Sequence, residues 1–485
     1  MLLCNTIYGL VIAPYILKYV GDSSYGVYKS VSSLSASLAV MDLGLGATMT
    51  RYMAKYHATN EKNKANNFTA MVFIQFAIVA TVIAILGCIA YGLLPSIYGV
   101  TFDKTELDLS KTLLIFLVAN MILRLFENLL SGAASGYARF TVSNGVKLLS
   151  IVAKFSLLFI LLPLVKNVLL IVALESILVI SGIVFLGWYM ICRIGIKPKL
   201  QKWDATVFKE SLIYTLLMFI QTITIQFNGN VDNVLIGAKL GSGYVTIYSM
   251  AIIIFGMYEH ISGSIAGVML PNMTKRVVTG QSAEQLQGGV EKAGRYQFFL
   301  LAAAMGGFIA LGREFYLLWL GEAYKDCYLL TLILIIPVTI PMVQNVALSI
   351  LRAQNKMGFR TLSLVISCVI NIAVTIMGIT LWGYWGAAIG TACATITNTV
   401  FMNLYYRRQL SFKIISMFIH IFGKTWICAA IATICTLYTG KWFDLSWISI
   451  IVRAFGFMLV YALLMLCIEM DAAEKNAIKR LIKRV

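Results

Sequence analysis

Charged residues are scarce in this sequence, and their scarcity excludes most kinds of protein. Only 12% of the 485 residues are charged and 60% are hydrophobic, and the mean hydropathy is +0.84. A soluble domain has about 25% charged residues, so this chain cannot cover a water-facing surface of its own size. Soluble enzymes, disordered proteins and coiled coils are therefore excluded. We predict an all-α integral membrane protein that crosses the bilayer many times.

Residues that build metal, redox and catalytic sites are also few. The three histidines, His57, His260 and His420, are far apart, and none of the nine cysteines belongs to a C-x-x-C pair. This pattern contains no zinc or redox framework, and no motif pairs a nucleophile with a base. We therefore expect no metal, no cofactor and no catalytic residue, and we expect a transporter rather than an enzyme.

Long apolar stretches predict fourteen membrane-spanning helices. Each is about 20 residues long or longer, which is the length that an α-helix needs to cross a bilayer. The predicted spans cover residues 2–20, 25–50, 67–95, 110–131, 139–162, 166–192, 207–230, 243–270, 293–319, 326–351, 359–381, 385–406, 416–438 and 446–468. No connection between them is long enough for a soluble domain, so any function must lie within the helix bundle or at its two faces.

The distribution of lysine and arginine predicts the orientation in the membrane. With the N-terminus in the cytoplasm, 25 of the 39 basic residues lie in cytoplasmic connections or the C-terminal tail, and 7 lie in the opposite connections. An excess of positive charge is typical of cytoplasmic loops. Both termini are therefore expected in the cytoplasm. The net charge of +18 then reflects topology, and no nucleic-acid partner is expected.

Two parts of the chain repeat at a lag near 220 residues. Gly21 and Tyr28 correspond to Gly241 and Tyr248, and residues 128–140 resemble residues 345–360. Six predicted spans separate the copies, so the two halves share one orientation, as do the parallel repeats of transporters. We predict an N-terminal six-helix lobe over residues 1–200 and a C-terminal six-helix lobe over residues 201–412. Two further helices and a basic tail occupy residues 413–485.

Several motifs resemble those of one transporter family. They are VGDSSYGVY at residues 20–28, MDLGL at 41–45, TRY at 50–52, LWLGEAY at 318–324, RAQ at 352–354 and GYWGAAIGT at 383–391. Together they resemble the O-antigen and capsule repeat-unit flippases, whose superfamily also holds the multidrug (MATE) exporters and the lipid II flippases. The resemblance implies two six-helix lobes around a central cavity that opens alternately to the two sides of the membrane.

The resemblance also implies a cargo and a location. The cargo would be an undecaprenyl-diphosphate-linked oligosaccharide, moved from the cytoplasmic to the outer leaflet of a bacterial inner membrane for O-antigen, lipopolysaccharide or capsule synthesis. A monomer is expected, with membrane lipids and the lipid-linked substrate as partners and with room for contacts with polysaccharide polymerase and chain-length machinery. Two alternatives stay open: an ion-coupled multidrug antiporter, and a membrane-embedded polymerase or glycosyltransferase.

Lysines within the predicted spans are the strongest candidates for substrate binding. An ionisable side chain at mid-bilayer costs at least about 2.5–3.5 kcal/mol, so each one needs a reason. Lys147 and Lys154 are seven residues apart, which places them on one face of a helix. They would form a cationic stripe that attracts a diphosphate or an acidic sugar. Alternatively, Lys147 extends to the inner face and Lys154 pairs with Glu175 or Asp42.

Three more basic residues belong to this predicted cationic cavity. Arg124 lies three residues before Glu127, and the two form either a neutral structural pair or a pair that opens when cargo or a proton arrives. Arg51 is either a cytoplasmic anchor or a contact for the diphosphate as it enters. Lys29 is a further intramembrane charge in the first half of the chain.

Acidic and neutral polar residues complete the candidate site. A set of acids is predicted to carry a coupling proton or sodium ion or to balance the basic residues: Asp42, Glu127, Glu175 and Glu259. A second set, at helical spacings of three and four, forms a polar stripe on one helix: Gln221, Thr224 and Asn228. Such amides and hydroxyls either bind sugar hydroxyls or form a seam between packed helices.

Overall fold

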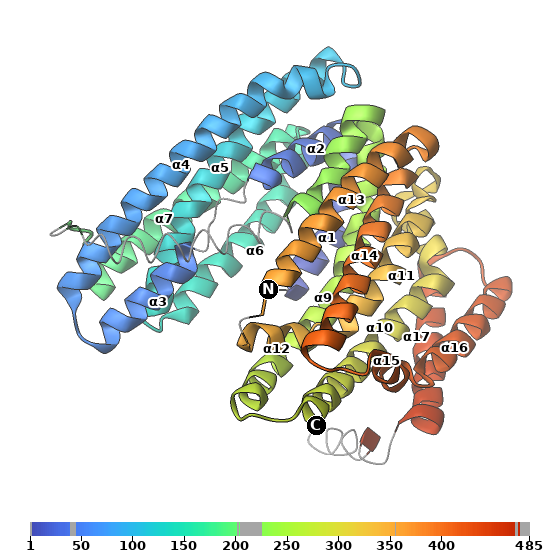
Figure 1. Cartoon of the computed structure of the whole chain (residues 1–485). Coiled ribbons are helices and arrows are strands. Elements are labelled where there is room, and N and C mark those ends of the chain that lie inside the picture. Colours follow the sequence, from blue (N-terminus) through green and yellow to red (C-terminus); the bar gives the residue numbers. More distant parts are fainter. Residues whose placement is uncertain are drawn as a thin grey trace. The chain divides into compact units, whose positions relative to one another are not determined.

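The computed structural model describes residues 2–38, 45–200, 203, 226–354, 356–470 and 474–475. All regular structure in these residues is helical (Figure 1), which confirms the predicted all-α fold. Within the described residues, nine helices are long and apolar enough to cross a membrane, and a bent helix pair adds a tenth candidate. The chain is thus a multi-pass membrane protein, while the count of fourteen spans stays a prediction.

The chain divides into two compact units, and the first comprises Met1–Ser249 with Thr375–Ala387. Its helices are α1 (Leu2–Val20), α2 (Asp22–Leu38), α3 (Leu45–Ala58), α4 (Lys62–Tyr98), α5 (Lys104–Gly136), α6 (Phe140–Val165), α7 (Leu169–Tyr189) and a helix over residues 226–240. A π-helical turn, Met190–Ile194, continues α7. The beginning of α9 (Ser242–Val278) also belongs to this unit.

The second unit comprises Met250–Val374 and Ala388–Val485. Besides the rest of α9, its helices are α10 (Ala283–Leu320), α11 (Cys327–Val343), α12 (Ala347–Ala353), α15 (Ile414–Phe422), α16 (Thr425–Thr439), α17 (Trp447–Leu464) and most of α13 (Gly358–Trp382) and α14 (Trp385–Gln409). The end of α13 and the start of α14 belong to the first unit. The buried Arg453 of α17 donates hydrogen bonds to Glu314 of α10 and to the Thr436 carbonyl of α16, so the last two long helices are fixed to α10. The predicted lobe boundaries at residues 200 and 412 stay predictions.

The described helices differ from the predicted spans in a few places. Residues 326–351 are interrupted between α11 and α12, and residues 416–438 are interrupted at Gly423, where α15 and α16 meet at 41°. The predicted end of the span at residue 230 is too early, because the helix continues to residue 240. Polar residues in this last part of the helix find hydrogen-bond partners inside the unit; for example, Asn233 donates to Ser33 over 2.9 Å.

Helix α5 lies at the centre of the first unit and contacts α2, α3, α4, α6 and α7 (Figure 1). Glycine allows its close approach to α3, because a Cβ atom at Gly132 would lie 2.5 Å from the Gly46 carbonyl oxygen. Thr50 of α3 also donates to the Gly132 carbonyl over 3.1 Å. Buried apolar side chains, such as Met53 and Leu129, fill the remaining space. This packing fixes the face that α5 presents to α6 and α7.

The predicted repeat is visible in the backbone at Gly21 and Gly241. Both have left-handed φ angles, 84° and 100°, and the N–H of each donates to the carbonyl four residues earlier. Helices α2 and α9 begin at the next residue. Each glycine therefore ends one helix and lets the chain start another in a new direction.

The two copies of this repeat also contact each other reciprocally within the first unit. Thr246 donates a hydrogen bond to the Asp22 carbonyl over 2.7 Å. Gly26 stands 220 residues before Thr246, and a Cβ atom there would overlap with the carbonyl of Ser242, which stands 220 residues after Asp22. Equivalent positions in the two copies thus make equivalent contacts, which is the behaviour of a local two-fold arrangement.

Candidate substrate-binding site

Three helices of the first unit, α5, α6 and α7, enclose a polar pocket of about 280 Å³. Its lining includes five of the charged residues that the sequence predicts for the site: Arg124, Glu127, Lys147, Lys154 and Glu175. The predicted common face of Lys147 and Lys154 is thus observed. Three basic and two acidic side chains give the pocket a formal charge of +1.

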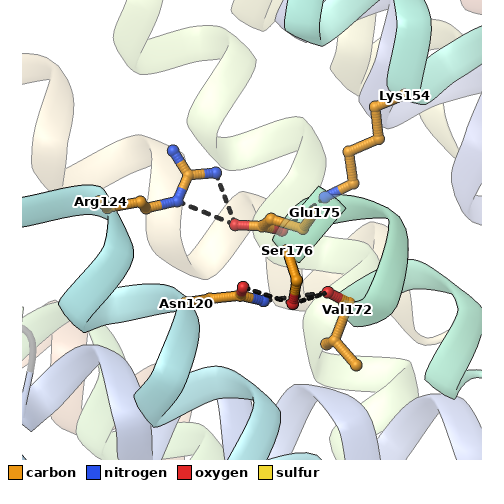
Figure 2. Close-up of polar contacts among 6 residues, drawn as sticks. All are labelled: Asn120, Arg124, Lys154, Val172, Glu175 and Ser176. Carbon is orange, nitrogen blue, oxygen red and sulfur yellow. Dashed lines mark hydrogen bonds and ion pairs between the residues drawn. The ribbon is translucent and has the colours of Figure 1, made fainter. Parts of the chain in front are cut away.

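Glu175 of α7 is the shared partner of two cations in this pocket. Arg124 of α5 donates to Glu175 Oε1 through Nε and Nη2, over 2.9 and 2.5 Å. Lys154 of α6 donates to the other oxygen, Oε2, over 2.6 Å, and Figure 2 shows both cations at the one carboxylate. Because these side chains lie in an apolar bundle, the ion pairs neutralise charges that would otherwise be costly to bury. The predicted alternative of Lys154 pairing with Glu175 is therefore the arrangement observed.

The predicted local pair between Arg124 and Glu127 does not form among the described residues. Arg124 of α5 binds Glu175 of α7. Glu127 of α5 lies against Gly182 of α7, where an added Cβ atom would lie 2.8 Å from Glu127 Oε1. The side chain of Glu127 is only 6% exposed. A spacing of three residues places Arg124 and Glu127 next to each other on α5. Their side chains nevertheless contact different residues of α7.

Lys147 and Glu127 are left without direct partners. In the part of the chain that the structure describes, neither side chain makes a hydrogen bond or an ion pair, although both line the pocket. They act on each other only electrostatically, without contact. A buried carboxylate and a lysine with unused hydrogen-bonding capacity are unfavourable for stability alone. Such groups are what a binding site for a polar ligand needs.

Neutral polar residues lie next to the charged ones and join the same helices (Figure 2). Asn120 of α5 donates to the Val172 carbonyl over 3.0 Å, and Ser176 of α7 donates to Asn120 Oδ1 over 2.6 Å. Ser131 of α5 and Ser143 of α6 form a further short hydrogen bond. These hydrogen bonds form a polar seam that holds α5 against α6 and α7.

The other basic candidates lie outside this pocket. Lys29 of α2 makes cation–π contacts with Tyr25 and Tyr28, and its Nζ lies 5.5 and 6.0 Å from their ring centroids. It lies near enough to Lys154 for the two charges to repel. Arg51 is exposed on α3 and makes no hydrogen bond or ion pair with any described residue. Their predicted roles at the site remain predictions.

Several candidates cannot be joined to the pocket. Glu259 is exposed on α9 in the second unit, and no described residue gives it a hydrogen bond or an ion pair. Asn228 is half-buried in the helix over residues 226–240. Three predicted residues lie outside the described part of the chain: Asp42, Gln221 and Thr224.

One buried acid was missed by the sequence reasoning. Asp232 is only 5% exposed, and it accepts hydrogen bonds from Tyr248 over 2.6 Å and from Thr375 over 3.4 Å. Asp232 falls between the predicted spans 207–230 and 243–270, whereas the helix continues to residue 240. The signal was present, since Asp232 continues the stripe of Gln221, Thr224 and Asn228 at a spacing of four.

Comparison with protein families decides the kinship of the chain. The family described as polysaccharide biosynthesis protein matches residues 1–277. The chain belongs to this family. A comparison with curated proteins finds no match. The match covers all three helices of the charged pocket and the first copy of the repeat.

Solved structures share the fold at low sequence identity. "Lipid II flippase MurJ, inward closed conformation" has a TM-score of 0.72 and 14% identity, over 94% of this chain and 95% of that one. An inward-facing multidrug resistance MATE family transporter of the MOP superfamily has a TM-score of 0.64 and 15% identity, over 84% and 98%. The MATE transporter ClbM in complex with Rb⁺ has a TM-score of 0.54 and 16% identity, over 86% and 93%. The predicted flippase-type and MATE-type fold is therefore confirmed.

Proposed function

We propose that this protein is a flippase for an undecaprenyl-diphosphate-linked oligosaccharide. It would move the cargo from the cytoplasmic to the outer leaflet of a bacterial inner membrane, for O-antigen or capsule synthesis, with both termini in the cytoplasm. The family match and the fold support a transporter of this general kind. The observation that carries the more specific proposal is the positively charged pocket with an unpartnered lysine.

The geometry of the pocket suits a diphosphate. Lys147 donates no hydrogen bond to a described residue, and Arg124 binds Glu175 through Nε and Nη2. The Arg124 side chain is 51% exposed, and its third nitrogen, Nη1, makes no hydrogen bond to a described residue. A lysine and an arginine together provide the flexible point charge and the directional donor that phosphate groups prefer.

The remaining charges would keep the pocket stable as the cargo enters and leaves. When Arg124 leaves Glu175 to bind the diphosphate, Lys154 still neutralises Glu175. When the cargo departs, Arg124 returns to Glu175, so that neither charge is left unpaired in the membrane. We propose that this exchange accompanies alternating access by the two halves of the transporter.

Ion coupling is a second part of the proposal. Glu127 is a buried carboxylate to which no described residue gives a hydrogen bond or an ion pair, and Asp232 is a buried carboxylate among hydroxyl groups. Either group could carry a proton or a sodium ion between the two sides of the membrane. These acids also favour the alternative function, an ion-coupled multidrug antiporter, because carboxylates attract organic cations.

A deletion experiment separates the two functions. Loss of the gene should remove the surface polysaccharide and cause its lipid-linked repeat unit to accumulate in the cytoplasmic leaflet. Intact surface polysaccharide together with new sensitivity to cationic dyes would instead establish the antiporter.

A variant of Lys147 tests the observation itself. Lys147→Ala should lower complementation of the deletion strain on the order of tenfold or more, because a hydrogen bond to a charged group contributes about 1.5–3 kcal/mol. Lys104→Ala, at the exposed start of α5, is the matched control and should complement normally. Equal complementation by both variants at equal expression would remove the pocket from the mechanism.

A further inference from the structure

An apolar groove runs beside the charged pocket, between α6 and α7. It has a volume of about 610 Å³ and is lined by α6 from Thr141 to Ala153 and by α7 from Leu178 to Phe185. Small residues are part of its lining, including Gly145 and Gly182. At its rim, Leu149 is 69% exposed and Phe185 is 45% exposed. The groove is thus an open, apolar channel within the first unit.

The groove and the charged pocket are continuous. Ser150 of α6 and Leu178 of α7 line both of them. Gly182 lines the groove, and the carboxylate of Glu127, which lines the pocket, lies against it. A ligand that is charged at one end and apolar along its length can therefore occupy both spaces at once.

The depth of the charges identifies the kind of lipid. Lys147 and Lys154 are seven and fourteen residues beyond the first residue of α6, which corresponds to about 10 and 21 Å along the helix. A resident phospholipid keeps its charged head at the membrane surface and presents only acyl chain at this depth. An anion joined to a long apolar chain reaches it only when that lipid is being carried across the membrane.

We propose that the α6–α7 groove binds the isoprenoid chain of the cargo lipid while the adjoining charged pocket holds its diphosphate. This inference rests on the proposed function and extends it, because it assigns the lipid chain a site on the first unit. The lining of the groove is mostly apolar, as an isoprenoid chain requires. The net charge of +1 in the pocket complements the anionic head.

Gly145 offers a clean way to fill the groove. Gly145 lines the groove, and a Cβ atom there would meet no atom within 4 Å, so a larger side chain starts from open space. Gly145→Leu should also favour the helix, since glycine is a poor helix former. Gly92→Leu is the matched control, because Gly92 is an exposed glycine of α4 with equally open surroundings and does not line the groove.

The experiment uses the full-length protein in phosphatidylcholine nanodiscs. The probe is a polyprenyl diphosphate with a photoactivatable group in its isoprenoid chain, and labelled residues are mapped by mass spectrometry. Labelling should fall within α6 and α7, and Gly145→Leu should lower it on the order of tenfold relative to Gly92→Leu. Ser181→Leu, which fills the groove from α7, should act like Gly145→Leu. Equal labelling of groove variants and control would overturn the proposal.

Competition identifies the occupant. Unlabelled polyprenyl diphosphate should displace the probe, whereas phosphatidylglycerol at the same concentration should not. Equal displacement by phosphatidylglycerol would mean that the groove holds ordinary lipid, and the proposal would fall.

The same preparation distinguishes this inference from the proposed function. Wild-type protein that translocates the lipid-linked oligosaccharide without groove labelling would overturn the groove site and leave the flippase intact. Groove labelling in a wild-type protein that moves no such lipid would overturn the flippase and leave a lipid-binding groove.

Discussion

At the scale of single residues, the charged pocket separates two lysines that the sequence treats alike. Lys147 and Lys154 share a helix face and line one pocket, yet among the described residues only Lys154 has an ionic partner, Glu175. Arg124 binds the same carboxylate. In an apolar bundle a charge is stable when it is paired and hydrogen-bonded. Lys154 and Glu175 therefore stabilise the pocket, while Lys147 is the lysine that we propose binds the cargo.

Removal of the shared carboxylate should destabilise the protein. Glu175→Gln leaves Lys154 and Arg124 without their counter-charge, and breaking a fully buried ion pair costs about 3–5 kcal/mol. We expect a smaller loss here, because the side chains of Lys154 and Glu175 are each 18% exposed. Thermal unfolding of the purified protein in detergent measures the effect. The double variant Lys154→Met/Glu175→Gln should recover part of the lost stability.

Glu127→Gln is the control for this prediction. Glu127 lines the same pocket without a hydrogen bond or ion pair to any described residue, so neutralising it should not lower the unfolding temperature. Equal destabilisation by Glu175→Gln and Glu127→Gln would show that the ion pairs do not set the stability of the pocket.

At the scale of secondary-structure elements, the contact between α5 and α7 decides where the charges point. Gly182 leaves room on α7 for the carboxylate of Glu127, and Asn120 ties α5 to the backbone of α7. Arg124 then lies opposite Glu175 rather than beside Glu127. The pocket is therefore a product of helix packing as much as of the charged residues themselves.

Two glycines of α7 test this packing. In Gly182→Ala, the new methyl group would lie 2.8 Å from Glu127 Oε1 and 3.3 Å from Val146 Cγ1, and such overpacking costs about 1–3 kcal/mol. In Gly187→Ala, the nearest atom is 3.9 Å away, so this control should be neutral or up to about 1 kcal/mol more stable. Unfolding temperatures in detergent compare the two, and a stable Gly182→Ala protein would contradict the packing described.

At the scale of the whole molecule, an internal repeat places the same helix-to-helix turn at two points of the chain. Gly21 and Gly241 have the same backbone conformation and the same position between two helices. A local motif has thus been retained at a lag of 220 residues, and it lies where the chain changes direction. The turn requires a left-handed residue in both copies.

Both glycines should therefore resist substitution. Gly21→Ala and Gly241→Ala force an L-residue into a left-handed conformation, which costs roughly 1–2 kcal/mol. Gly243→Ala is the control, because Gly243 has no left-handed φ and no atom near its Cβ position. Circular dichroism during heating should show two destabilised variants and one normal variant. Normal stability of Gly21→Ala or Gly241→Ala would mean that the turn can be rebuilt.

The orientation of the chain is open to a direct test. The bias of lysine and arginine predicts that a green fluorescent protein fused after Val485 folds and fluoresces, because this terminus should be cytoplasmic. Alkaline phosphatase fused at Lys441, in the connection before α17, should be active because it should lie outside. The reverse pattern of reporter activities would invert the predicted topology.

Much of the fold follows from the sequence alone. Continuous apolar stretches can satisfy their backbone hydrogen bonds in lipid only as helices, so the all-α class and most helix positions are determined locally. The exceptions are segments where polar residues find partners inside the bundle. Asp232 and Asn233 look like loop residues, but Tyr248 and Ser33 satisfy them within a helix. These partners lie on other helices, so the residues around Asp232 and Asn233 in the sequence cannot predict them.

The sequence also identified the charges within the predicted spans, but the tertiary structure decided how they pair. Spacing placed Lys147 and Lys154 on one face, because a helix repeats every 3.6 residues. Only packing assigned Glu175 to both Arg124 and Lys154 and left Lys147 without an ion pair to any described residue. Ion pairing depends on which side chains of other helices come within a few ångströms. That proximity is set by how α5, α6 and α7 pack, and no single helix encodes it.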